Sequence, residues 1–99
     1  MAPNIHMKGH ILLQLNDAPD GLWDYEIASQ VLKDYDVDKN TVFWKGEVRA
    51  TLTDMFSGAL IEELEDKLDD GEHFGPERVL CKFRLTPFGR ERMQETGIL

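Results

Sequence analysis

The chain has 99 residues, of which 41% are hydrophobic and 9% aromatic, a composition that excludes a disordered protein and fits one domain with a modest core. No apolar run approaches the roughly 18 residues needed to cross a bilayer, and no signal-peptide pattern opens the chain. The lone cysteine, Cys81, excludes an intramolecular disulfide, so we expect a reducing, cytoplasmic setting and no membrane association.

The first third of the chain predicts two helices separated by a turn. Residues 1–6 form a tail, residues 97–99 form another, and the domain is expected to occupy residues 7–96. Apolar residues at helical spacing predict a helix over 5–15, with Asn4 as its N-cap. A turn around Pro19 and a short extended segment at 21–23 follow. Asp24 then caps a second helix over 25–35, because the apolar stripe from Ile27 to Tyr35 repeats at helical spacing.

The middle of the chain predicts a third helix over residues 47–56. Polar residues 36–40 indicate a turn, and the β-branched and aromatic segment 41–44 predicts an extended connector. Val48, Leu52 and Met55 mark the buried side of the helix. Gly58 lies just beyond it, where a left-handed C-cap residue is expected.

The last third predicts a hairpin and a final helix. Residues 59–66 fit a first strand, although their apolar spacing fits a helix as well, and residues 69–77 form the hairpin loop. Residues 78–86 alternate as a second strand, whose inward residues are expected to be Val79, Cys81, Phe83 and Leu85. Thr86 caps a last helix that starts at Pro87 and ends near Gly97.

Three strings resemble the winged-helix transcriptional regulators of the PadR-like kind. Residues 21–28, GLWDYEIA, are similar to the opening of that family's second helix. Residues 48–52, VRATL, followed by 58–61, GALI, resemble the end of its third helix and its entry into the wing, with either Ala59 inserted after the glycine or the glycine shifted by one position. Residues 83–91, FRLTPFGRE, resemble the exit from the second wing strand. Small archaeal and viral winged-helix regulators resemble the chain equally well.

The resemblance implies an α+β fold: a winged helix-turn-helix with a three-helix core, a two- to three-stranded antiparallel wing and a C-terminal helix. It also implies a transcriptional regulator that binds specific sequences of double-stranded DNA, and we expect this regulator to act as a repressor. In that arrangement the third helix enters the major groove. The expected DNA-binding residues are Lys45 and Gly46 at the N-terminus of the third helix, where the backbone amide near Gly46 would bind a phosphate, Arg49, Ala50 and Thr53 on that helix, and Arg78, Lys82 and Arg84 on the wing.

The formal charge of −8 bears on the DNA-binding function and on its alternative. DNA-binding interfaces often neutralise about six or more phosphates, which needs more positive charge than one copy offers. We therefore expect a homodimer, formed by the first and last helices with Met93 and Ile98. The alternative is a protein–protein interaction module without DNA binding, whose acidic wing, residues 62–66, meets a basic partner. Trp44 and Phe74 are aromatic residues that suit such an interface, although Trp44 is more simply a core residue.

The sequence contains no pattern typical of an enzyme, a cofactor site or a metal site. His6 and His10 are four residues apart, but no cysteine or acid stands at ligand spacing beside them. Cys81 alternates with apolar strand residues and is expected to be a small buried residue. We therefore predict a non-enzymatic protein that needs no cofactor or metal.

Overall fold

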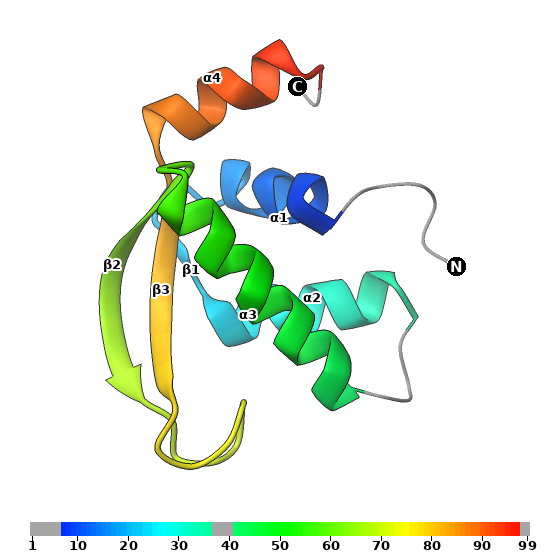
Figure 1. The fold of residues 1–99 in the computed structure, drawn as a ribbon, viewed down its shortest axis with the longest axis vertical. Helices are drawn as coiled ribbons and strands as arrows, with labels where there is room; N and C mark the ends of the chain where they lie inside the picture. The colour runs from blue at the N-terminus through cyan, green and yellow to red at the C-terminus, as the bar shows by residue number, and fades with distance from the viewer. Residues whose placement is uncertain (1–6, 37–40, 98–99) are drawn as a thin grey trace.

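The computed structural model describes residues 7–36 and 41–97, so the predicted Asn4 cap and the 1–6 tail lie outside the described residues. Within these ranges the chain is of the α+β class, with helices on an antiparallel sheet and a C-terminal helix (Figure 1). In chain order the elements are α1 (Met7–Asn16), β1 (Leu22–Trp23), α2 (Asp24–Asp34), α3 (Thr41–Ser57), β2 (Ile61–Leu68), β3 (Val79–Leu85) and α4 (Pro87–Glu95). No helix of the described ranges is both long and apolar enough to traverse a bilayer.

The sheet has the order β1-β3-β2, and both pairs are antiparallel. β1 contributes only two residues, with Leu22 opposite Phe83. The β2–β3 hairpin runs from the pair Ile61–Leu85 to the pair Leu68–Val79, so the segment whose spacing fits both a helix and a strand is a strand. Its register shifts between Glu63 and Glu65, which leaves Leu64 as an extra residue and bends the strand.

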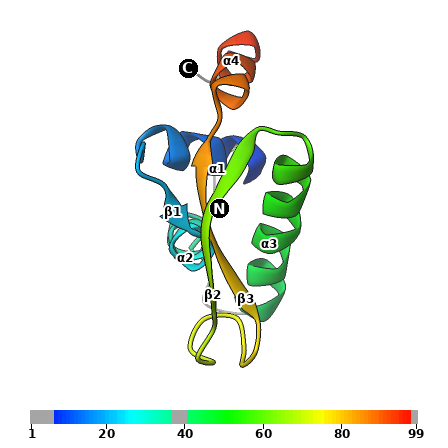
Figure 2. The ribbon, with the colours of Figure 1, turned by 90° about the vertical axis from the view of Figure 1, so that its left-hand side faces the viewer.

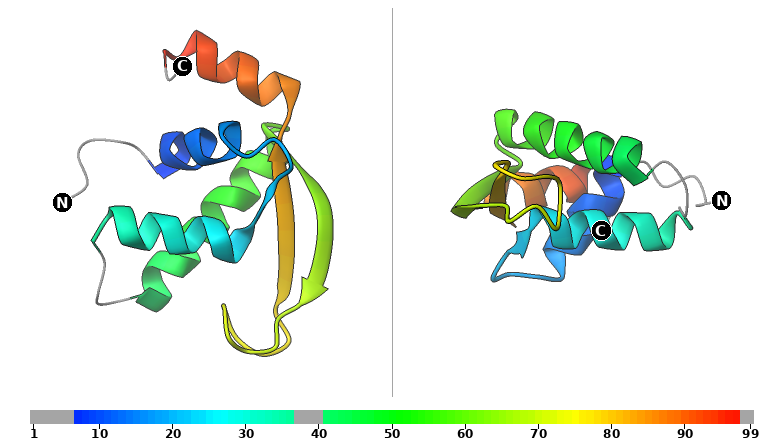
Figure 3. Two further views of the ribbon diagram at one scale, coloured as in Figure 1. Left: turned by 180° about the vertical axis from the view of Figure 1, so that it is seen from behind. Right: turned by 90° about the horizontal axis from the view of Figure 1, so that it is seen from below.

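The core lies where α1, α2 and α3 meet each other and the sheet. Figures 2 and 3 show α3 on one side of the hairpin and α2 with β1 on the other, while α4 lies at the end far from the hairpin loop. The buried cluster draws on every helix and on all the strands except β1: Ile11, Leu12, Leu15, Ile27, Ala28, Val31, Val48, Leu52, Met55, Ile61, Phe83, Leu85 and Met93. The apolar residues whose spacing predicted the first three helices are therefore largely the residues that these helices bury in the core.

Helix α3 begins at Thr41, so the extended connector expected at 41–44 is wrong. The physical reason is tertiary packing. A helix places Trp44 one turn before Val48, in line with Leu52 and Met55, and so extends the apolar stripe toward α2. The Trp44 ring meets the Tyr35 ring edge-on, with ring centroids 5.5 Å apart, and this contact outweighs the strand propensity of the segment.

The end of α3 also differs from the expectation. The left-handed residue is Ala59, with φ of 62°, and not Gly58. The Leu60 amide donates to the Met55 carbonyl oxygen at 3.0 Å, the long hydrogen bond that closes a helix around a left-handed residue. The left-handed position therefore lies one residue after the glycine, and an alanine adopts this strained conformation.

Three other local expectations have mixed outcomes. Asp24 is the first residue of α2 and not its cap, because its carboxylate turns to the sheet and accepts from the Cys81 amide at 3.1 Å. On β3 the expected inward face is wrong at Val79, which is 47% exposed, whereas Leu80 is buried and Cys81 only partly so. Thr86 caps α4 as predicted, since its hydroxyl accepts from the Gly89 amide at 2.9 Å.

Candidate functional site

The hairpin loop (residues 69–78) lies against the N-terminal half of α3, and this contact joins the two regions expected to bind DNA. Lys45 donates from Nζ to the His73 carbonyl oxygen at 2.9 Å. The Arg49 guanidinium lies over the Phe74 ring, 4.9 Å from its centroid. Both cations expected to read DNA from this helix therefore hold the loop.

Asp69 organises the loop from within. Its carboxylate accepts hydrogen bonds from the amides of Gly71, His73, Phe74 and Gly75, at 2.9, 3.3, 2.6 and 3.0 Å. Burial alone would raise the pKa of the Asp69 carboxyl, but these four donors stabilise the charged form and hold the pKa well below its usual range. The loop is thus closed around a carboxylate that stays ionised.

A second set of aromatic contacts holds the other side of the loop. The His73 ring stacks on Tyr25 at the start of α2, with centroids 3.9 Å apart. Trp23 stacks on Tyr25 in turn, and the Lys67 ammonium lies 4.5 Å from the centroid of the Trp23 ring. The loop is therefore fixed between α2 and α3, in a position that neither helix would impose alone.

Two basic residues of β3 are paired with acids of β2 across the hairpin. Arg84 Nη2 lies 2.8 Å from Glu62 Oε1, and Lys82 Nζ lies 3.6 Å from Glu65 Oε2. Of the three basic hairpin residues expected to contact DNA, only Arg78 has no ion pair with a described side chain, and its amide donates to the Gly75 carbonyl oxygen. Lys45 and Arg49 thus contact the loop, which contains Arg78, whereas Lys82 and Arg84 form ion pairs with acids of β2.

The outer face of α3, which we define as Val42, Phe43, Gly46 and Ala50, is apolar and open to solvent. Val42 is 84% exposed and Phe43 is 59% exposed. Gly46 lies inside the helix, so its amide is not one of the free donors of a helix start, and a side chain added there would meet open space. Ala50 is exposed, and so is Thr53, whose hydroxyl donates back to the Arg49 carbonyl oxygen.

The other expected interface residues are buried to different degrees. Met93 is fully buried within the domain, so it does not offer the dimer surface expected of it, and Ile98 lies outside the described residues. Phe74 is partly buried and packs against the core. Trp44 is also partly buried, in contact with Tyr35, which accords with its reading as a packing residue.

The carboxylates of Asp69 and Asp24 and the thiol of Cys81 are held by contacts within the domain. Ligand atoms of Asp69, Asp70 and His73 lie within 4.8 Å of one another, but the Asp69 carboxylate already accepts from four amides. Asp24 is buried with one carboxylate oxygen unpartnered, and desolvation raises its pKa. Burial and the neighbouring Glu63 raise the pKa of the Cys81 thiol to about 12, so this thiol stays protonated and unreactive.

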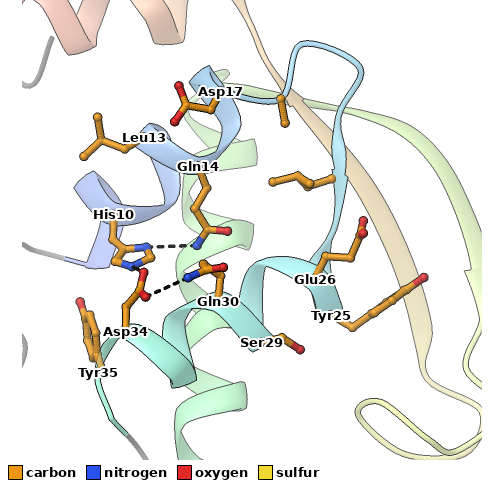
Figure 4. A pocket seen from close by; sticks show the side chains of 12 residues that line it. His10, Leu13, Gln14, Asp17, Tyr25, Glu26, Ser29, Gln30, Asp34 and Tyr35 are labelled. Carbon is orange, nitrogen blue, oxygen red and sulfur yellow. Dashed lines mark hydrogen bonds and ion pairs between the residues drawn. The ribbon is translucent and has the colours of Figure 1, made fainter.

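A groove of about 1070 Å³ between α1 and α2 is the feature that the sequence did not reveal (Figure 4). One wall is a hydrogen-bonded chain across the two helices. Gln14 donates to His10 Nδ1 at 3.1 Å, and His10 Nε2 donates to Asp34 at 2.8 Å. Gln30 donates to the other Asp34 oxygen at 2.8 Å. His10 is therefore bound to an acid 24 residues away, a pairing that no local spacing indicates.

Comparison of the chain with protein-family models, with curated proteins and with solved structures gave no match. The outer face of α3 and the groove between α1 and α2 are the two surfaces that bear on function.

Proposed function

We propose that this chain is a winged-helix domain that binds a partner protein through the outer face of α3. The order of helix, short strand, helix, helix, hairpin and helix supports the winged-helix assignment, with the β2–β3 hairpin as the wing. The resemblance of segments 21–28 and 83–91 to that family supports it independently. A fold of this kind presents its third helix to a partner, and the chemistry of that helix decides which partner.

The observation that carries the proposal is the exposure of Val42 and Phe43 beside the small residues Gly46 and Ala50. Large apolar side chains grouped on one helix face mark contact surfaces, because they lose contact with water when a partner covers them. The glycine and the alanine allow the partner's backbone to approach closely. Phe43 is the kind of aromatic anchor that contributes most to such interfaces.

The partner's own chemistry follows from the charges beside this face. Glu47 and Asp54 are exposed on the same side of α3 as Phe43, and Asp54 pairs with Lys8 at 3.0 Å. The complementary surface is therefore an apolar patch bordered by lysine or arginine.

Charge also decides against duplex DNA as the first choice. Lys45, Arg49 and Arg78 are three cations, and the loop that they surround carries the acids Asp69, Asp70, Glu72 and Glu77. A DNA-binding surface commonly neutralises about six or more phosphates. This end of the molecule has no excess of positive charge with which to do so.

Site-specific photo-crosslinking in the cells that make the protein tests the proposal. A photoreactive phenylalanine analogue at position 43 should yield a discrete crosslink to a different protein, and a crosslink to a second copy of this acidic chain would contradict the partner chemistry proposed. The same analogue at position 88, where Phe88 is 49% exposed on α4, is the matched control. Gly46→Arg should abolish the product at 43. Equal products at both positions, or none at 43, would refute the proposal.

Duplex DNA binding is the second candidate, and one observation favours it. Lys45 and Arg49 lie on α3 against the hairpin loop, which contains Arg78, and in winged-helix proteins the third helix and the wing contact DNA. Titration with mixed duplex DNA, followed by amide chemical shifts, separates the two functions. Shifts confined to residues 45–53 and 78–84 that weaken with salt would establish DNA binding. An absence of shifts at low salt would exclude it.

A further inference from the structure

We propose that the groove between α1 and α2 is a binding site for a small organic cation with an apolar body, such as an arylalkyl amine. The groove is separate from the outer face of α3, since the two surfaces share no lining residue. Its volume of about 1070 Å³ slightly exceeds the range usual for small-molecule sites, roughly 300–1,000 Å³.

The apolar part of the groove comes from three separate segments. Leu13 lines it from α1, Ala18 from the following turn and Leu22 from β1. Because these aliphatic side chains belong to different elements, the fold holds them as a preformed surface. Burying a ring against them would release water and supply the non-directional part of the affinity.

The polar part of the groove contains acceptors and acids. Asp17 and Glu26 stand near the apolar wall, as Figure 4 shows. Glu26 uses Oε1 to accept from the Trp23 amide, and the Asp17 carboxylate has no partner among the described side chains. The Gln14 side chain donates through its nitrogen to His10 and Ile27, which leaves its amide oxygen as an acceptor.

Charge complementarity selects the ligand class. The described residues that line the groove include three carboxylates, those of Asp17, Glu26 and Asp34, and no lysine or arginine. The two oxygens of Asp34 already accept from His10 and Gln30, so Asp17 and Glu26 are the groups available to an ammonium. An anionic ligand would meet uncompensated negative charge, and a neutral one would gain no ion pair with these acids.

Three ligands with one ring system and different charges test the inference. The probes are tryptamine, its neutral alcohol analogue tryptophol, and the anion indole-3-acetate, each titrated into the protein at neutral pH with amide shifts as the readout. Tryptamine should give saturable shifts at residues 10–35, tryptophol should bind at least about fivefold more weakly, and the anion should give none. Equal binding of all three, or no saturable shift with tryptamine, would overturn the proposal.

Asp17→Asn and Asp20→Asn form a matched pair of variants. Both acids are exposed in the same turn, but only Asp17 lines the groove. Asp17→Asn should weaken tryptamine binding about two- to fivefold, and Asp20→Asn should leave it unchanged. Equal weakening by both would show that only the general negative charge of the domain attracts the amine, and so would refute a defined site.

Discussion

Two buried carboxylates of this domain show how strongly local donors decide the state of a residue. Asp69 accepts four backbone hydrogen bonds, so its pKa falls although burial opposes this. Asp24 accepts from the Cys81 amide through one oxygen, its other oxygen is unpartnered, and desolvation raises its pKa. The same side chain is therefore stabilised as an anion in the hairpin loop and made costly as an anion at the start of α2.

Asp69→Asn should destabilise the domain most at neutral pH and progressively less in acid. Because the folded pKa is well below the unfolded value of about 3.9, the charge stabilisation is complete above the unfolded value and decreases steadily as the pH falls from there toward the folded pKa. The asparagine amide also presents a donor to the loop amides, which need acceptors. Urea unfolding of both proteins from neutral pH down to about pH 2.5 measures the difference.

Asp70→Asn provides the control for this experiment, since Asp70 is exposed and accepts only the Glu72 amide, at 3.0 Å. Its effect should be small at every pH. If Asp69→Asn remained equally destabilising across the whole pH range, the carboxylate charge would not be the source of the loop's stability.

Among the elements, the junction of α3 and β2 has the clearest conflict between residue type and backbone. The chain reverses at Ala59 with a positive φ, and the preceding glycine does not take that role. The Leu60 amide and the Thr86 hydroxyl fix this reversal, because the hydroxyl donates to the Ala59 carbonyl oxygen at 2.7 Å. Hydrogen bonds of the Leu60 amide and of Thr86, the N-cap of α4, therefore hold an alanine in a conformation that costs an L-residue about 1–2 kcal/mol.

Ala59→Gly should raise the free energy of unfolding by about 0.5–1 kcal/mol, since relief of the left-handed conformation exceeds the extra freedom of glycine in the unfolded chain. Gly58→Ala is the matched control. A side chain at that position meets its nearest neighbour at 3.6 Å, an ordinary contact, so it should be tolerated. Chemical unfolding of the three proteins checks the pair. A destabilised Ala59→Gly protein would contradict the assigned backbone.

For the molecule as a whole, the excess of negative charge is distributed over a small domain. Nineteen acidic residues oppose eleven basic ones, and many of the described bases are already engaged, as Lys82 is with Glu65 and Lys8 with Asp54. Exposed ion pairs of this kind contribute at most about 1 kcal/mol each. The remaining acids repel one another in the folded state more than in the expanded unfolded chain.

Added salt should therefore stabilise the domain. Raising NaCl from about 0.05 M to about 0.5 M should raise Tm by roughly 4–8 °C, which corresponds to about 1 kcal/mol for a domain of this size. Asp20→Lys changes the net charge from −8 to −6, because one negative charge is lost and one positive charge is gained, and should make the salt dependence shallower. A Tm that falls with salt would show that the ion pairs dominate instead.

The sequence by itself determined the order and type of most elements, because those features depend on residues close together in the chain. Apolar spacing located α2 and the later part of α3, alternation located β3, and Thr86 with Pro87 located the start of α4. The resemblance to winged-helix regulators directed attention to Lys45 and Arg49, which contact the hairpin loop in the structure.

Only the tertiary structure decided what those residues contact. The first turn of α3 is helical because Trp44 packs on Tyr35, and Asp24 turns to the sheet because Cys81 offers its amide there. The pairing of Arg84 with Glu62 and of His10 with Asp34 joins residues 22 and 24 positions apart. Sequence periodicity describes which face of an element is apolar, but the charge of a surface and the shape of a groove depend on which elements the core brings together.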